Sequence, residues 1–515
     1  TRQRFGDSTA HGRLLSGPLM GRSVAVRAAA LRGVEAIPVT VEVSPGGGVP
    51  GFVITGGNDS PIFDAAVRVR CAMRECGFEI PQVRYTVNLA PADMKKGGTA
   101  YDLAIAVAIL IASGQIPPRV ADGAVFAGEL ALNGCVEPVR GAAAYASLAA
   151  SGDLDLIASS RTPAFGGERS NIIGIENLGQ LKGGLEGLSR IVGDFDEDAR
   201  ERFLDDCGLD FSDVVDQEIP KRAMVIAAAG RHGLLMVGPP GAGKSMLAKR
   251  LPTILPPLTA EERAEALLIH SVAGQPLDSI ARGVRPFRAP HHSISLGGLV
   301  GGGRPVLPGE LSLADKGVLF LDELPEFAGN VLQSMRQPME DREVRIVRVD
   351  GVYTFPCDFQ LIAAANPCPC GHLGDPGHSC TCSPSRVQSY QNKIGGPLMD
   401  RIDVVCDVAR PSEKSIIRGG NGMGSSEMRE LVANAREFRS WRTSREGEQT
   451  GPGGARLEDG ARAMFEEYAA RLRLGGRAIV RIARVARTIG DLSEHELVGE
   501  QDVVEALGFR SRATL

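Results

Sequence analysis

The middle of the chain carries apolar runs that are too continuous for half-exposed strands. Such runs occupy 234–237, 318–321 and 359–365, and a further strand-like run follows at 404–408. Strands that are apolar on both faces are typical of a parallel sheet that helices cover on each side. The pattern therefore predicts an α/β core with a parallel sheet in this part of the chain.

Two other patterns flank this region. Before it, strand-like runs at 39–43, 84–89 and 125–128 alternate with helical segments such as 102–112. This alternation predicts a separate α+β domain. After it, an Arg-Pro step and a Gly/Ser-rich break precede residues whose apolar spacing predicts amphipathic helices.

These patterns divide the chain into segments. An acidic, glycine-containing connector separates the first domain from the core, and glycine-rich residues form an insertion in the last segment at 447–454. The expected segments are 1–20 for a leader or a cloning remnant, 21–181 for the α+β domain, 182–209 for the linker, 210–408 for the core with a cysteine-rich insertion at 366–384, and 409–515 for the helical region.

Composition and charge narrow the class of protein. Of the 515 residues, 43% are apolar and 23% are charged, which is ordinary for a folded multidomain chain and excludes overall disorder. The net charge of −5 provides no general attraction to nucleic acid or membrane, so such a partner must meet a local patch. The longest apolar stretch, 103–112, is too short to span a bilayer, and no signal-peptide pattern opens the sequence. We therefore expect a cytoplasmic protein without a membrane partner.

A glycine-rich loop follows the first core strand and precedes a helical segment. Its consecutive backbone N–H groups can turn inward around phosphate oxygens, while its lysine adds a positive charge and its serine hydroxyl can bind Mg²⁺. This arrangement predicts binding of a nucleoside triphosphate, ATP, together with magnesium. The loop consists of Gly238, Pro239, Pro240, Gly241, Ala242, Gly243, Lys244 and Ser245.

Polar residues at the ends of two further core strands add the chemistry of hydrolysis. Asp322 and Glu323 follow the run at 318–321, where the first can hold Mg²⁺ and the second can activate the attacking water. Asn366 follows the run at 359–365. Because the carboxyl ends of parallel strands meet at one edge, its amide can contact the γ-phosphate or the lytic water. Taken alone, the acids could instead begin a capped helix and the asparagine could cap a turn.

Four of the ten cysteines lie close together in the cysteine-rich insertion. They are Cys368, Cys370, Cys380 and Cys382. Thiolates at this spacing, flanked by turn-forming glycine and proline, suit a tetrahedral Zn²⁺ site, because disulfides are disfavoured in a cytosolic protein. His372 and His378 are additional donors. The spacing differs from that of the commonest zinc knuckles, so a redox site or a loop without metal remains the alternative.

Six motifs occur in order along the chain. They are GPPGAGKS (238–245), RPFRAPHHSIS (285–295), PGELSLADKGVLFLDELPEF (308–327), AAANPCPCG (363–371), GGPLMDRIDVV (395–405) and GGRAIVRIARVARTIGDL (475–492). Together they resemble the magnesium-chelatase-like AAA+ ATPases of the YifB and ComM family over nearly the whole chain. The resemblance implies an AAA+ core followed by a helical lid, working as a ring that we expect to be a hexamer.

The resemblance also implies roles for single residues. By position in the motifs, Asn366 is similar to sensor 1 and Arg401 to an arginine finger that acts on the neighbouring subunit's nucleotide. Arg477 is similar to the sensor 2 arginine. An isolated arginine at position 401 would usually form a surface ion pair. His291 and His292 resemble part of the family's helix-2 insertion, which makes them candidates for the ring pore, although ordinary loop histidines fit equally well.

The first domain resembles the Lon-protease-like domain at the front of this family. Thr99 lies at the position of the protease's nucleophilic serine, and Tyr145 lies at the position of its lysine base. A phenol with an ordinary pKa of about 10 is a poor base at neutral pH. The resemblance therefore implies a non-proteolytic scaffold or docking domain.

The leading hypothesis for function is carried by the resemblance: an ATP-driven DNA motor, a branch-migration helicase acting in recombination of incoming single-stranded DNA, with recombination proteins as possible partners. A basic helical series supports a contact with DNA. The series is Arg473, Arg477, Arg481, Arg484 and Arg487. The alternatives are a magnesium-chelatase-like ATPase that remodels a protein for metal insertion, and a chaperone-like remodeller. DNA-stimulated ATP hydrolysis separates the first hypothesis from the other two.

Overall fold

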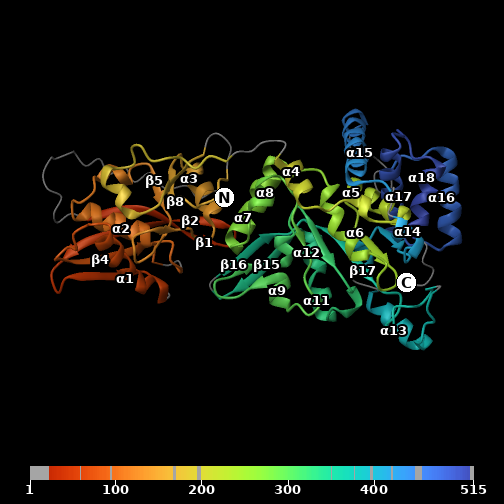
Figure 1. The fold of residues 1–515 in the computed structure, drawn as a ribbon, viewed down its shortest axis with the longest axis horizontal. Coiled ribbons are helices and arrows are strands. Elements are labelled where there is room, and N and C mark those ends of the chain that lie inside the picture. Colours follow the sequence, from red (N-terminus) through yellow and green to blue (C-terminus); the bar gives the residue numbers. More distant parts are fainter. Residues whose placement is uncertain are drawn as a thin grey trace.

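The computed structural model describes residues 23–57, 60–92, 96–165, 170–193, 199–349, 351–375, 377–394, 398–418, 422–446 and 455–510. The leader expected at 1–20 and the insertion expected at 447–454 lie outside these ranges. The described residues form an N-terminal mixed-sheet domain, a core with a parallel five-stranded sheet and a C-terminal helical region, which follow one another along the long axis in Figure 1. The multidomain α/β fold predicted from the sequence is confirmed.

A four-stranded sheet with the order β1-β2-β4-β3 forms one layer of the N-terminal domain. Its β1/β2 and β2/β4 pairs are antiparallel, and its β3/β4 pair is parallel. Helix α2 packs on β1 and β2 and is buried along its whole length, because every side chain after Asp102 is apolar. The elements are β1 (Val24–Arg32), β2 (Glu35–Gly46), β3 (Gly51–Thr55), α1 (Ser60–Glu75), β4 (Arg84–Ala90) and α2 (Asp102–Ala112).

The second half of this domain is a three-stranded parallel sheet, β5-β8-β9, with helix α3 beside it. Helix α3 also docks on the core: the Gly141 and Ala143 amides donate to the Ser271 carbonyl and hydroxyl at 2.9 and 3.2 Å. The elements are η1 (Pro118–Ala121), β5 (Ala124–Phe126), β6 (Glu129–Leu130), β7 (Val136–Glu137), α3 (Ala142–Ser151), β8 (Asp155–Ser159), β9 (Ile172–Ile175) and η2 (Leu178–Gly183).

The core sheet has the order β11-β14-β17-β10-β18, and all of its pairs are parallel. Every residue of β10, β14 and β17 is buried, as the continuous apolar runs predict. Helix α5 packs against β10 and β18. The sheet strands and this helix are α5 (Glu218–Gly230), β10 (Leu234–Val237), β11 (Phe287–Arg288), β14 (Val318–Leu321), β17 (Gln360–Ala365) and β18 (Val404–Asp407).

Short elements between the core strands carry the insertions. A β15–β16 hairpin and the α9 segment lie below the sheet in Figure 1, and α13 follows the cysteine-rich loop. Part of the expected linker is helical and attached to the core, because the Arg200 side chain donates to the Leu255 carbonyl at 2.5 Å. The elements are α4 (Ala199–Asp206), η3 (Phe211–Asp213), α6 (Lys244–Arg250), η4 (Leu251–Thr253), α7 (Ala260–Ala273), α8 (Asp278–Ala281), α9 (Leu296–Val300), β12 (Gly301–Gly302), β13 (Leu307–Pro308), α10 (Glu310–Leu313), η5 (Leu324–Glu326), α11 (Gly329–Ser334), α12 (Arg336–Asp341), β15 (Glu343–Arg348), β16 (Gly351–Pro356), α13 (Pro384–Ile394) and η6 (Met399–Arg401).

Helix α17 is the centre of the C-terminal region and packs against α5, α15 and α18. A buried ion-pair network fixes α15 to α17, since Asp491 accepts from Arg442 and Arg487 at 3.0 and 3.2 Å. No helix in the described ranges is both long and apolar enough to cross a membrane. The elements are α14 (Glu413–Arg418), α15 (Ser425–Glu446), α16 (Asp459–Arg471), α17 (Gly476–Leu492) and α18 (Glu500–Gly508).

The arginine series along α17 does not form the exposed basic face expected from its spacing. Arg487 and Arg481 are buried, and Arg473 precedes the helix in a left-handed conformation with φ +49°. Arg481 donates to the carbonyls of Met399 and Ile402, so it joins the helix to the core. Arg477 and Arg484 are exposed, but they lie close to Asp400 and Asp403. The series is therefore divided between packed and exposed positions and forms no continuous basic face.

Candidate functional site

The glycine-rich loop lies at the carboxyl edge of the core sheet, between β10 and α6. A Cβ atom at Gly238 would lie 2.1 Å from the Val408 carbonyl oxygen, so no side chain fits at the start of the loop. Gly241 and Gly243 have φ values of +77° and +91°, in the region that favours glycine. These three positions let the backbone turn closely around a phosphate group.

Lys244 is held over this loop by three oxygen acceptors. Its ammonium donates to the carbonyls of Gly238 and Pro239 at 2.7 and 3.0 Å and to the Asn366 side chain at 3.1 Å. Burial lowers the pKa of the lysine. Asn366 follows β17, the neighbour of β10, so the parallel sheet brings the two side chains together.

Ser245 and Asp322 form the part of the site that suits a magnesium ion. The serine hydroxyl donates to the aspartate carboxylate at 2.5 Å, and Asp322 follows the apolar strand β14. A hydroxyl and a carboxylate are the hard oxygen ligands that Mg²⁺ prefers, usually together with water and nucleotide phosphate. These two residues would hold the ion, which would neutralise charge on the phosphates when bound.

Glu323 is the candidate base, and His292 lies beside it. The glutamate has a left-handed backbone with φ +53° and a half-exposed side chain, and His292 Nδ1 lies 3.4 Å from its carboxylate. The histidine ring also packs edge-on against Phe327. We did not expect His292 at this edge from the sequence, although its position just after β11 was the available signal. This placement favours a role in orienting Glu323 over the pore role.

Arg401 and Arg477 lie at the opposite, amino edge of the sheet. Arg401 ends η6, just before β18, and β18 runs parallel to β10 along its whole length. A strand of this length separates the edge from the phosphate loop by roughly 13 Å. Arg401 pairs with Glu340, and Arg477 donates to Asp400 at 2.9 Å. Both guanidinium groups therefore form ion pairs at the edge of the sheet that lies opposite the phosphate loop of the same chain.

The four clustered cysteines converge, with all four sulfur atoms within 4.8 Å of one another. The sulfur of Cys368 lies 3.4 Å from that of Cys370 and 3.7 Å from that of Cys380. A tetrahedral zinc ion with Zn–S bonds of about 2.3 Å requires sulfur separations of about 3.8 Å. The donor set therefore fits zinc.

The cysteine loop packs directly on the phosphate loop. A Cβ atom at Gly371 would lie 2.6 Å from the Pro240 ring, which shows how closely the two loops approach. Arg410 donates to the Pro240 carbonyl at 3.0 Å and lies 3.8 Å from Asp375. Asp375 also accepts from the ring of His372 at 3.2 Å. Order in the cysteine loop is thus coupled to the backbone that surrounds phosphate.

The tyrosine expected at the position of the Lon lysine cannot serve as a base. Thr99 donates its hydroxyl to Glu129 at 2.5 Å, and Tyr145 lies buried in α3. Burial raises the pKa of this phenol above its ordinary value. Tyr145 is therefore neutral at physiological pH and has no means of accepting a proton from a nucleophile.

Comparison with known proteins places the chain in a family. It is 38% identical over 506 residues to the uncharacterized protein YifB of Escherichia coli, covering 96% of this chain and 97% of that protein. It is 37% identical over 501 residues to the competence protein ComM of Haemophilus influenzae, covering 94% and 96%. The chain belongs to the YifB/ComM family of magnesium-chelatase-like proteins.

Three family matches cover the regions seen in the fold. Residues 41–159 match the family described as subunit ChlI of Mg-chelatase, 210–416 match magnesium chelatase, subunit ChlI, and 422–510 match its C-terminal domain. The second match contains the phosphate loop and both acids that follow β14. The chain is therefore a magnesium-chelatase-like ATPase, and its AAA-type core implies ATP and magnesium.

Variants of Lys244 and Glu323 should have different defects. Lys244→Ala is expected to weaken ATP binding about tenfold or more, because it removes a charge-assisted contact to phosphate. Glu323→Gln should bind ATP normally and hydrolyse it about 100-fold more slowly, because the base is lost. Binding of a fluorescent ATP analogue and release of phosphate measure the two steps. Parental hydrolysis by Glu323→Gln at saturating Mg²⁺-ATP would refute the assignment of the base.

Protein purified without added metal should contain about one zinc ion per chain, as elemental analysis can measure. Cys380→Ser is expected to lose the metal and to weaken ATP binding, because the cysteine loop packs on Pro240. Cys207→Ser is a matched control, since this cysteine is exposed and outside the cluster. Metal-free wild-type protein whose four clustered thiols react freely would exclude the zinc site.

Proposed function

We propose that the chain is an ATP-hydrolysing ring motor that acts on DNA, a branch-migration helicase in homologous recombination and natural transformation. The name of one relative, competence protein ComM, supports the connection with DNA uptake. One observation supports assembly into a ring: the phosphate loop and Arg401 lie at opposite edges of the same sheet. A subunit arranged in this way needs a neighbour to bring an arginine to its nucleotide.

The same geometry supports assignments for the remaining site residues. We assign phosphate binding to the glycine-rich loop with Lys244, magnesium binding to Ser245 and Asp322, and water activation to Glu323. Asn366 serves as sensor 1. Arg401 and Arg477 act on the neighbouring subunit's nucleotide, and AAA-type ATPases are typically oligomeric; we expect six subunits.

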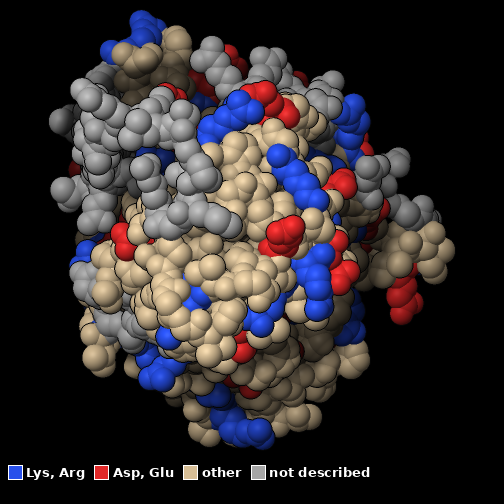
Figure 2. Space-filling view, turned by 90° about the vertical axis from the view of Figure 1, so that its left-hand side faces the viewer, with Lys and Arg blue, Asp and Glu red and all other residues tan. Residues whose placement is uncertain are grey.

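The N-terminal domain is assigned a docking role without peptidase activity. Its α3 helix, which carries Tyr145, contacts the ATPase core through Ser271. On the outer face of this domain, basic and acidic side chains are intermingled rather than gathered into one patch (Figure 2). This distribution favours a DNA contact elsewhere in the molecule. The match to magnesium chelatase keeps remodelling of a protein partner, for metal insertion or as a chaperone, as the alternative function.

Mixing subunits tests the ring. Arg401→Ala protein is expected to bind ATP but hydrolyse it about 10³-fold more slowly, because the finger acts on the neighbour's nucleotide. When Arg401→Ala protein is mixed with wild-type protein, the rate of ATP hydrolysis should fall by more than the fraction of variant subunits in the mixture. Arg462→Ala, which removes an exposed arginine of α16, is the control and should leave turnover unchanged. Mixed rings with proportional turnover would make Arg401 a structural residue.

Forked or branched DNA should stimulate ATP hydrolysis and be unwound, with little sequence preference. Affinity is expected to fall steeply with salt, because phosphate contacts release counterions. Lys244→Ala should bind DNA but fail to move it. Absence of both DNA binding and stimulation at low salt, with ATP and Mg²⁺ present, would leave protein remodelling as the better function.

A further inference from the structure

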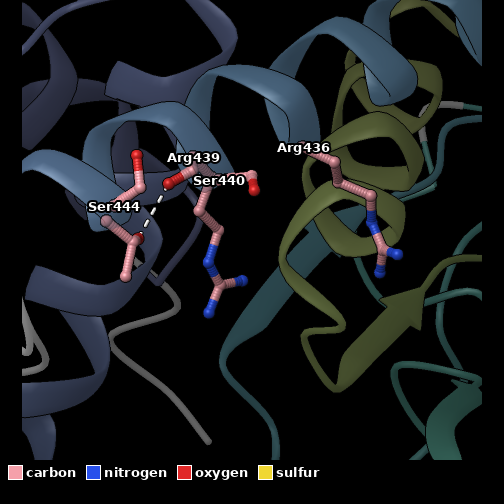
Figure 3. Close-up of a pocket in the computed structure, with 5 residues that line it drawn as sticks. Arg436, Arg439, Ser440 and Ser444 are labelled. Carbon is pink, nitrogen blue, oxygen red and sulfur yellow. Dashed lines mark hydrogen bonds between the residues drawn. The ribbon is translucent and has the colours of Figure 1, made fainter.

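A pocket of about 460 Å³ opens along one face of α15 in the helical region, and side chains from three successive turns of the helix line it. They are Arg436, Arg439, Ser440, Thr443 and Ser444. In Figure 3 the side chains of Arg436 and Arg439 extend from the same side of the helix. The lining therefore combines two guanidinium groups with hydroxyl groups and contains no acid.

Arg436 is half-buried and has one unsatisfied donor. Its Nε atom is buried and has no hydrogen-bond partner among the described residues, and neither pocket arginine forms an ion pair with them. Burial and the nearby positive charges of Arg285 and Arg231 lower the pKa of Arg436 to about 10, although Glu262 opposes this shift. An enclosed N–H group without an acceptor costs free energy that an anionic ligand would recover.

The same helix shows how this protein holds a structural arginine. Arg442, less than two turns after Arg436, is fully buried and pairs with the buried carboxylate of Asp491 at 3.0 Å. Arg436 is half-buried and has no such acid among the described residues, which leaves room for a partner from outside the chain. Buried polar groups without partners are rare in proteins, and a bound ion is one explanation for them.

We propose that this pocket binds a phosphate group of a nucleic-acid backbone. The assignment rests on the proposed function and names the surface that DNA contacts. A guanidinium group can donate two parallel hydrogen bonds to a phosphate, and serine and threonine hydroxyls are common additional contacts. The chain's own nucleotide is unsuitable, because α15 packs on α5 and α17 while the phosphate loop lies at the far edge of the sheet.

The test measures binding of a fluorescein-labelled single-stranded oligonucleotide by anisotropy, with ATP-bound full-length protein at several salt concentrations. The double variant Arg436→Gln, Arg439→Gln should bind about tenfold more weakly, and its affinity should depend less steeply on salt by one to two phosphate contacts. Arg462→Gln, with an exposed arginine of α16 replaced, should bind like wild type.

Each outcome distinguishes this site from the broader function. Wild-type affinity and salt dependence in the double variant would overturn the pocket and leave the DNA motor standing. Failure of wild-type protein to bind the oligonucleotide would overturn both. Retained DNA binding with weakened ATP binding would assign the pocket to a neighbouring subunit's nucleotide and also overturn the proposal.

Two control experiments test whether the variants fold normally. Because Arg436 has no partner in the described chain, Arg436→Gln should not lower the thermal unfolding midpoint, whereas loss of a structural arginine would. Arg439 is exposed on the surface of α15, so the single variant Arg439→Gln tests the pocket without disturbing the interior. Unchanged DNA affinity in this folded variant would contradict the proposed contact.

Discussion

The parallel pairing of β10 with β17 and β18 is the constraint on which the ATPase geometry depends. It places Leu234 beside Ile362 and Val404, so the three strands begin and end at common edges. Everything that follows a strand meets at the carboxyl edge, and everything that precedes one meets at the amino edge. The phosphate loop and Asn366 thus share one edge, while Arg401 lies on the other. In the ring that we propose, the neighbouring subunit would bring these two half-sites together.

The helical region is attached to the amino edge. His232, which precedes β10, contacts Asp403 at 3.0 Å and the Thr488 hydroxyl at 2.8 Å, so one buried imidazole joins the sheet to α17. Arg481 adds a second link to the carbonyls before β18. These contacts surround the edge that carries Arg401, so in the proposed ring the helical region would lie near a neighbour's nucleotide rather than its own. The cysteine loop, by contrast, touches Pro240 and is coupled to the chain's own phosphate loop.

Local sequence predicted the sheet well, because a continuous apolar run such as 318–321 has few ways to be buried except between helices. The sequence also predicted that Asn366 lies near the phosphate loop. Residues that follow parallel strands meet at the same edge of the sheet, whatever the order of the strands. It did not predict contacts between loops: the position of His292 after a strand indicates the edge of the sheet, but not its contact with Glu323. Helical spacing also does not say which positions are covered, and for that reason it did not reveal that Arg481 and Arg487 are packed against other parts of the chain.

Arginines of the helical region are held in two ways, and this difference says more about function than their spacing does. Arg442 and Arg487 are buried and share Asp491, so hydrogen bonds within the chain offset the cost of burying them. Arg436 lies on the same helix as Arg442 and is half-buried, and its enclosed Nε atom has no acceptor among the described residues. Its place in a pocket lined by hydroxyl groups is explained if the site binds an anion.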